Sequence, residues 1–172
     1  MKKIRIGWFI PVQYNYKDYN RVMASVWIRC LQLIEPLQPL GYESTINQPW
    51  KKVDIAIFLR VQGSWAQKLQ RYLQWRGVKT IFSVIVNYYE REGNIEKIRR
   101  TVTDEHIKQC ITMTREANAV VTCSHFLRTR AEQHNDNVFY LPDTVTRRHF
   151  NRTKNTLDFD RLPLKLIWSG KA

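Results

Sequence analysis

The chain has 172 residues, and its 28 lysines and arginines outnumber its 15 acidic residues, which gives a formal net charge of +13 at pH 7. A hydrophobic share of 44% with few glycines and prolines is typical of one globular domain and excludes a disordered tail. No apolar run approaches the ~18 residues of a membrane-spanning helix. The charge favours an anionic partner, such as nucleic acid, an acidic membrane surface or a phosphorylated substrate. A single lobe whose missing neighbour is acidic would explain the charge equally well.

The cysteines and the N-terminus indicate a cellular compartment. Cys30, Cys110 and Cys123 are far apart and have apolar neighbours, so we expect three buried thiols in a reducing compartment, and neither a metal nor a redox site. Arg5 interrupts the first apolar run and Pro11 ends it, which argues against a secretory signal. We therefore expect a cytoplasmic protein, with peripheral attachment to the inner membrane face as an open alternative.

The first third of the chain begins with a strand and a helix. Residues 3–10 begin with alternating polar and apolar side chains and continue with apolar ones, as expected of an inner strand. Residues 11–20 are predicted to form a polar loop, and they include three tyrosines. Apolar spacing predicts a helix over residues 23–37, which Pro36 should bend or end. Neither a G-x-G-x-x-G nor a Walker-type phosphate loop follows the first strand, so the usual dinucleotide and P-loop functions are excluded.

Two predicted strands, at residues 42–46 and 53–59, lead to a helix. Ser64 and Gln67 have the spacing of a capping box, so this helix should begin at Trp65. Its predicted apolar stripe consists of Trp65, Leu69, Tyr72 and Leu73.

The middle of the chain contains the longest predicted strand and the longest predicted helix. The strand covers residues 78–86, and polar or aromatic residues follow at its carboxyl end: Asn87, Tyr88, Tyr89 and Glu90. Residues 95–117 are predicted to be helical in one or two pieces, because Thr103-Asp104-Glu105 has the composition of a new helix N-terminus.

Residues 119–141 have the pattern of a strand, a helix and a second strand. Residues 119–123 form the first strand, Ser124 is the predicted N-cap, and the helix ends near His134. Its apolar face consists of Phe126, Leu127 and Ala131. Residues 138–141 form the second strand, and such a unit makes the two strands parallel, with ligands at their carboxyl ends. The whole pattern predicts an α/β fold, a Rossmann-like open parallel sheet with helices on both faces.

The last part of the chain predicts the beginning of a second lobe. Residues 151–161 are polar and lack periodicity, and residues 164–168 have the apolar pattern of a strand that leads into a glycine turn. We therefore expect one domain over residues 1–150, a linker over residues 151–163 and the first strand of a truncated C-terminal lobe over residues 164–172. The alternative is that this strand completes an edge of the first sheet.

Three stretches carry a family resemblance: residues 25–29 (SVWIR) with the Gly41-Tyr42 exit, residues 116–124 (EANAVVTCS), and residues 138–150 with Leu-Pro-Asp and a terminal phenylalanine. In this order and spacing they resemble the N-terminal, acceptor-side lobe of a GT-B fold glycosyltransferase, of the retaining type similar to family 4 (group 1) enzymes. Residues 166–170 look like the opening strand and glycine loop of the second lobe. Together these stretches cover most of the chain.

The resemblance implies one lobe of a two-lobed enzyme that transfers a sugar from a nucleotide-sugar donor to an acceptor. This lobe would hold the acceptor, the missing C-terminal lobe would hold most of the donor, and neither a metal nor another cofactor is expected. Gly170 and Lys171 would approach the donor phosphate only with that second lobe in place, so the fragment alone should be inactive.

The chain departs from the family pattern at several positions. Asn118 replaces the usual aspartate, and Asp143-Thr144 replaces Asn-Gly. Relatives often have a histidine or aspartate after the fourth strand, where this chain has Ser83 and Asn87. Since asparagine cannot act as a general base, no catalytic residue is assigned.

The expected substrate-binding residues share a position at predicted strand ends, loops or the first helix. Arginine forks fit phosphate oxygens, tyrosine rings stack on sugars or simply pack, and amide and carboxylate groups bind sugar hydroxyls. A serine at a helix N-terminus can bind an anion or act as a plain cap. The set is Tyr14, Ser25, Arg29, Arg60, Asn87, Tyr88, Glu90 and Ser124.

The rival hypothesis is a basic Rossmann-like module that binds nucleic acid or an anionic membrane. Nucleic-acid binding requires exposed aromatic residues interleaved with basic residues, and here most aromatics fall on apolar stripes, so no nucleic acid is expected. Trp65 and Trp75, which have basic neighbours, are the expected contacts with a membrane surface.

Overall fold

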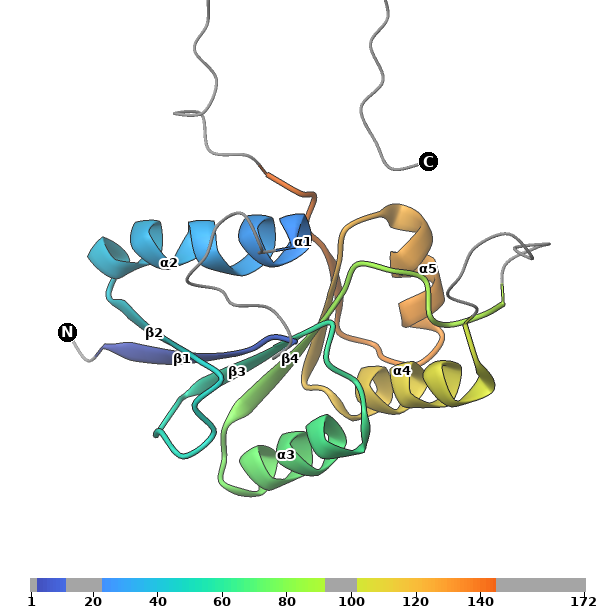
Figure 1. Cartoon of the computed structure of the whole chain (residues 1–172), viewed down its shortest axis with the longest axis horizontal. Coiled ribbons are helices and arrows are strands. Elements are labelled where there is room, and N and C mark those ends of the chain that lie inside the picture. The colour runs from blue at the N-terminus through green and yellow to red at the C-terminus, as the bar shows by residue number, and fades with distance from the viewer. Residues whose placement is uncertain (1–2, 12–22, 92–101, 145–172) are drawn as a thin grey trace, which may run out of the picture.

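The computed structural model describes residues 3–11, 23–91 and 102–144, and in this part of the chain six parallel strands form one sheet (Figure 1). Across the sheet the strands lie in the order β2-β1-β3-β4-β5-β6. Their bounds are Ile4–Phe9 for β1, Tyr42–Ile46 for β2, Ile55–Leu59 for β3, Lys79–Val84 for β4, Ala119–Thr122 for β5 and Val138–Tyr140 for β6. The predicted α/β fold with a Rossmann-like parallel sheet is therefore confirmed.

Each of these strands lies inside the range predicted for it, and β2 has both of its predicted ends. The linker over residues 151–163 and the strand over residues 164–168 lie outside the described residues, so the division into a domain and a second lobe stays a prediction.

The crossovers reverse their direction at β1. The chain passes from β1 to β2 on one side, adds β3 on the other side of β1, and then continues outward through β4, β5 and β6. Trp8 of β1 lies opposite Ile46 of β2 and Ile57 of β3. Doubly wound sheets bind ligands beside such a reversal, outside the carboxyl ends of the strands. The boundary between β1 and β3 is therefore where a site is expected.

The helix predicted over residues 23–37 is present, but its winding changes along its length. Its pieces are the turn α1 (Ala24–Val26), the π-helical η2 (Trp27–Leu31), α2 (Gln32–Leu37) and the 3-10 helix η3 (Gln38–Leu40). Pro36 lies in the last turn of α2, as expected of a residue that cannot continue an α-helix. The chain then leaves through Gly41 in a left-handed conformation (φ 88°). Arg29 lies in the π-helical piece, a winding that is frequent at functional sites.

Two of the three predicted helix starts are confirmed. Thr103 caps α4 (Asp104–Glu116) by accepting a hydrogen bond from the His106 backbone N–H at 3.2 Å, and Ser124 caps α5 (His125–Glu132) in the same way. The third helix, α3 (Ser64–Trp75), begins one residue before its predicted start, and the predicted capping box is wrong, because Gly63 is at the N-cap position and no side chain caps the helix. The Gln67 side-chain N–H donates to the backbone carbonyl of Gln62 at 3.1 Å, a contact outside the predicted capping box.

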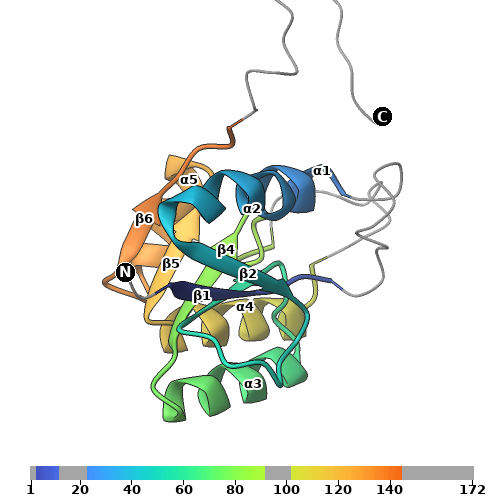
Figure 2. The same cartoon turned by 90° about the vertical axis from the view of Figure 1, so that its left-hand side faces the viewer.

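Helices cover both faces of the sheet and form two hydrophobic cores (Figures 1 and 2). The helical stretch from α1 to α2 packs on one face, where Val26 and Cys30 meet Ile6, Trp8 and Ile10 of the first strand region. Helices α3, α4 and α5 contribute to the core on the other face, whose largest fully buried members are Phe9, Phe58, Phe82 and Met113. Burial of both faces is what a parallel sheet requires.

Two predicted apolar faces differ from the observed ones. In α3 the buried residues are Ala66, Gln70 and Leu73, whereas Trp65 and Tyr72 are 52% and 46% exposed. The side-chain N–H of the buried Gln70 donates to the carbonyl of Met113 at 3.3 Å, whereas its side-chain oxygen has no hydrogen-bond partner within the described residues. In α5, Leu127 and Ala131 are buried as predicted, but Phe126 is 47% exposed, with the Arg130 guanidinium over its ring. Large rings therefore flank the true buried stripes in both helices.

The position of Phe58 in the core leads to a stability prediction. Phe58 is fully buried, so Phe58→Ala should lower the free energy of unfolding by about 3–5 kcal/mol, through lost burial and a cavity. The matched control Phe126→Ala should cost less than about 1 kcal/mol, because that ring is half in water already. Urea denaturation followed by circular dichroism measures both variants. Equal losses would contradict the assignment of these two faces.

Candidate functional site

Polar side chains gather at the carboxyl edge of the sheet, where the parallel strands end together. Arg60 follows β3, Asn87 lies three residues after β4, Ser124 follows β5 by two residues, and Asp143 follows β6 by three. The helical stretch after β1 adds Ser25 and Arg29 to the same region through contacts with Arg60 and Asp143.

Arg60 marks the reversal point between β1 and β3. Its backbone is in the left-handed region (φ 58°), which is uncommon for a residue with a Cβ atom. Its Nη1 donates to the hydroxyl of Ser25 at 3.2 Å and to the sulfur of Met23 at 3.1 Å. Such backbone strain persists where surrounding contacts hold it, and it is concentrated at functional sites. Two of the predicted substrate-binding residues are thus brought into direct contact.

Arg29 is a second arginine at this edge, and it is almost fully buried, with 7% of its side chain exposed. Its Nε donates to Asp143 Oδ1 at 2.5 Å, and its Nη2 donates to the carbonyl oxygen of Leu141 at 2.5 Å. A buried guanidinium needs such partners because an unpaired charge is strongly disfavoured in a protein interior. Asp143 itself is half exposed, so the pair reaches from the interior to the surface.

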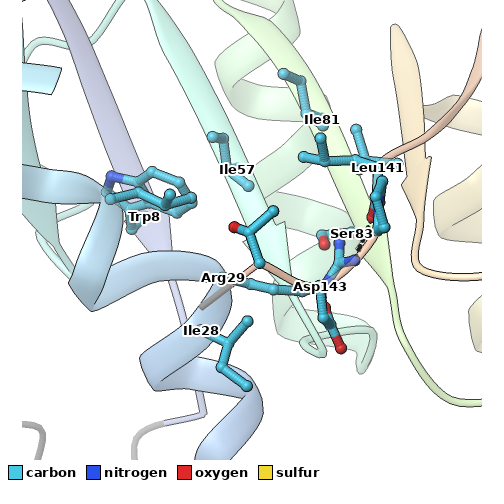
Figure 3. Close-up of a pocket in the computed structure, with 12 residues that line it drawn as sticks. Trp8, Ile28, Arg29, Ile57, Ile81, Ser83, Leu141 and Asp143 are labelled. Carbon is cyan, nitrogen blue, oxygen red and sulfur yellow. Dashed lines mark hydrogen bonds and ion pairs between the residues drawn. The ribbon is translucent and has the colours of Figure 1, made fainter. Parts of the chain in front are cut away.

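A cavity of about 280 Å³ lies next to this ion pair, between the helix and the sheet (Figure 3). Its walls are largely apolar, and the polar groups are Arg29, Asp143, the buried Ser83 and Thr144. The apolar walls come from Trp8, Ile28, Leu33, Ile57, Ile81, Val121, Leu141 and Pro142. Asp143 is the one carboxylate among these lining residues, and its ion pair with Arg29 leaves it poorly suited to act as a general base.

Asn87, Tyr88 and Glu90 form a separate group in the turn after β4. The Asn87 amide donates to Glu90 Oε1 at 3.4 Å, and its carbonyl accepts from the Tyr89 backbone N–H at 3.1 Å. Arg130 of α5 donates to the same Glu90 oxygen at 2.9 Å. The ring of Tyr88 lies 6.1 Å from the His106 ring at the start of α4. Asn87 and Glu90, the predicted sugar-binding pair, are therefore close together. Their side chains already form hydrogen bonds that hold the turn in place.

Ser124 and Asn118 have structural partners. The Ser124 hydroxyl accepts the Leu127 backbone N–H at 3.2 Å, which is the plain capping role, and anion binding at this residue stays a prediction. The Asn118 carbonyl accepts the Thr80 backbone N–H at 2.8 Å and so ties the start of β4 to the start of β5. That contact requires a side-chain oxygen as acceptor, which asparagine and aspartate both supply.

The three thiols differ in their surroundings. Cys30 and Cys110 are buried as predicted, and burial raises the pKa of each to about 12. Cys123 is only partly buried, which corrects the expectation of a third buried thiol, because it follows the last residue of β5 and lies at the open edge. Burial raises the pKa of Cys123 as well, and the nearby Arg29 charge opposes that shift.

Several expected site residues fall outside the described residues, namely Tyr14 in the first loop and Gly170 and Lys171 near the C-terminus. Within residues 3–11, 23–91 and 102–144, no group of three or more histidine, cysteine or acidic side chains is arranged to hold a metal ion. In the same part of the chain, no helix combines the length and the apolar character needed to cross a membrane.

Three participants in this site were not among the expected substrate-binding residues. Asp143 followed a predicted strand and therefore had a detectable signal, but its partner Arg29 is 114 residues away. Ser83 could have been inferred from the alternation of β4, which directs it to the same face as Ile81. Arg130 had no signal, because its contact with Glu90 depends on how α5 packs.

No protein-family model matches this chain, and searches of curated proteins and of solved structures also find no match. Function must therefore be inferred from the residues of this edge and from the sequence pattern.

The thiol environments lead to a reactivity prediction. At pH 8 a thiol-specific reagent should modify Cys123 alone in the folded chain, and all three cysteines after denaturation. A pKa of about 12 leaves Cys30 and Cys110 almost entirely protonated, and the thiolate is the reactive form. The raised pKa of Cys123 means that its reaction should still accelerate as the pH rises above 8. Mass spectrometry of the modified peptides measures this, and Cys123→Ser should remove the native reaction. Rapid labelling of Cys30 in the folded chain would contradict the structure.

The ion pair between Arg29 and Asp143 leads to a stability prediction. Asp143→Asn should lower the free energy of unfolding by about 1–2 kcal/mol, because it leaves a buried guanidinium without its counter-charge. In a double-mutant cycle with Arg29→Met, the coupling energy should be about 1 kcal/mol. The control cycle uses Arg128 and Glu132, an exposed pair on α5 whose coupling should be about 0.3–0.5 kcal/mol. Additive effects in the first cycle would show that the buried pair does not couple.

Proposed function

We propose that this chain is the acceptor-binding lobe of a glycosyltransferase, which transfers a sugar from a nucleotide-sugar donor to an acceptor. The donor would be held mainly by a second lobe, and the described lobe would supply one wall of the cleft between them. The nucleotide-sugar is a substrate in this proposal, and no metal or resident cofactor is assigned. Three unpaired thiols, two of them buried, fit a cytoplasmic location for the enzyme.

The observation that carries this proposal is the position of Arg60. It lies at the reversal point of a doubly wound parallel sheet, which is where such folds bind phosphorylated and sugar-containing ligands. Ser25 and Met23 contact one of its terminal nitrogens, Nη1. Among the described residues, its Nε and Nη2 make no hydrogen bond, so they could donate to phosphate or to sugar hydroxyls.

The chemistry of the edge fits acceptor binding better than catalysis by this lobe alone. Asp143 and Glu90 are both held by arginines, and neither is a ready general base. Serine, asparagine and arginine side chains instead supply neutral or positive hydrogen-bond partners for hydroxyl and phosphate oxygens. The apolar cavity beside Arg29 adds a surface for a less polar portion of the acceptor. A lobe of this kind orients a substrate while its partner lobe binds the activated sugar.

The test is a binding measurement on the 172-residue chain. Oligosaccharides and sugar phosphates are titrated into labelled protein, and nuclear magnetic resonance follows the backbone signals. A binding acceptor should shift signals around Ser25 and Arg60, whereas a nucleotide-sugar should bind only weakly without the second lobe. Arg60→Gln should weaken acceptor binding about tenfold or more, because a charge-assisted hydrogen bond is lost.

The matched control for that variant is Arg71→Gln, which removes an exposed arginine of α3 that pairs with Glu116. It should leave acceptor binding unchanged. If no carbohydrate or sugar phosphate binds, or if Arg60→Gln binds them as well as the unaltered chain, the proposed function is wrong. Binding of DNA or RNA alone, with a steep dependence on salt, would support the rival hypothesis instead.

A further inference from the structure

Exposed tryptophans and basic residues lie at the opposite, amino edge of the sheet. Trp75, the last residue of α3, is 82% exposed, and Trp50, in the connection between β2 and β3, is 76% exposed. We call these residues and their neighbours the tryptophan patch, which consists of Trp50, Lys51, Lys52, Tyr72, Trp75 and Arg76. Single exposed rings are common on protein surfaces, whereas large rings grouped with basic residues are typical of a contact surface.

The topology explains why segments 20 residues apart form one patch. Since β3 and β4 are parallel, both begin at the same edge, so the residues just before each strand come together there. Lys51, Lys52 and Arg76 line one shallow hollow with the buried Val53, Leu73 and Val78 at its base. Figure 1 shows the end of α3 and the connection between β2 and β3 on the same side of the molecule.

Contacts within the patch connect Tyr72, Trp75 and Arg76. The rings of Tyr72 and Trp75 are 6.2 Å apart, and the Arg76 guanidinium lies 5.7 Å above the Tyr72 ring. Arg76 also donates to the Tyr72 hydroxyl at 3.2 Å. Trp65 does not belong to the patch, since it lies at the other end of α3, about 15 Å along the helix, where its ring forms a T-shaped pair with that of Phe9. The structure thus separates the two tryptophans that the sequence suggested as joint contacts.

The patch carries positive charge that nearby acidic residues do not neutralise. Asp54 is bound by Arg5 at 2.7 Å, and Glu43 is bound by Lys3 at 2.8 Å. Within the described part of the chain, no carboxylate forms an ion pair with Lys51, Lys52 or Arg76. Three cations therefore remain beside two exposed indoles.

We infer that the tryptophan patch binds an anionic membrane surface. Tryptophan and tyrosine rings favour the headgroup region, where the ring is shielded from water and the N–H or O–H stays hydrated. Lysine and arginine beside them reach the lipid phosphates, and their aliphatic stems cover apolar surface. Nucleic acid fits less well, because it needs basic residues along a groove that tracks the backbone, whereas these cations surround one small hollow. This inference does not depend on sugar transfer.

The test is sedimentation of the 172-residue chain with lipid vesicles. One set is pure phosphatidylcholine, and the other contains about one third phosphatidylglycerol, which supplies the negative surface. The chain should bind the anionic vesicles and should bind the neutral ones much more weakly. Neutralising both lysines with Lys51→Gln and Lys52→Gln should weaken partitioning about 25-fold, at about fivefold for each basic residue. Trp50→Ala with Trp75→Ala should weaken it by at least about tenfold.

Matched controls separate the patch from the general charge of the chain. Lys108→Gln removes an exposed lysine of α4, and Trp65→Ala removes the tryptophan at the other end of α3; both should bind as the unaltered chain does. All patch positions are exposed, so the variants should fold, which circular dichroism checks. Brominated lipids should quench the fluorescence of the unaltered chain and quench the Trp50, Trp75 double variant much less.

Three outcomes would overturn the inference. They are absence of binding to anionic vesicles, equal losses in the control and patch variants, and binding of nucleic acid alone that the patch variants abolish. None of these results bears on acceptor binding at Arg60, so the two proposals fail independently.

Discussion

All the described strands run in one direction, and the two ends of the molecule differ because of that constraint. Parallel strands need a connection that returns the chain to the starting edge, and here most connections contain a helix that also covers a face of the sheet. Every strand therefore ends at the carboxyl edge, where Arg60 and Asp143 lie, and begins at the amino edge. Residues 47–54 return to the amino edge without a helix, and Trp50 in this connection is exposed.

Much of this fold could be predicted because its signals are local. Apolar runs in the sequence predicted the positions of all the described strands. Thr103 and Ser124 predicted two helix starts, because each side chain caps the helix that follows it directly in the chain. What failed depends on neighbours far away in the sequence. A hydrophobic residue at helical spacing is expected in the core, yet the Phe126 side chain is about half exposed. The polar Gln70 is buried instead, and it donates a hydrogen bond to the carbonyl of a residue 43 positions away. The change to π-helical winding at Trp27 likewise has no sequence signal.

The site was predictable to a smaller degree, because strand ends can be located but their partners cannot. Arg60 was expected at the edge since it follows a buried strand, and the contact with Ser25 adds a reason that only the structure supplies. Arg29 was predicted as a binding residue because an arginine fork fits phosphate oxygens. Its partner Asp143 follows the last described strand, β6, which brings the two residues together. Asn87 and Glu90 were correctly paired by proximity in the sequence, whereas Arg130 could not be inferred.

The two edges use positive charge in different ways. At the carboxyl edge, Arg29 and Arg130 are matched by Asp143 and Glu90, so these cations fix the geometry of the wall. At the amino edge, the basic residues of the tryptophan patch have no carboxylate partner within the described residues, so they remain available to an anionic surface. The strands separate these edges by about 15–20 Å, at about 3.3 Å for each residue. A chain held to a membrane through the tryptophan patch would therefore present Arg60 to the aqueous side, and a substrate would reach it from solution.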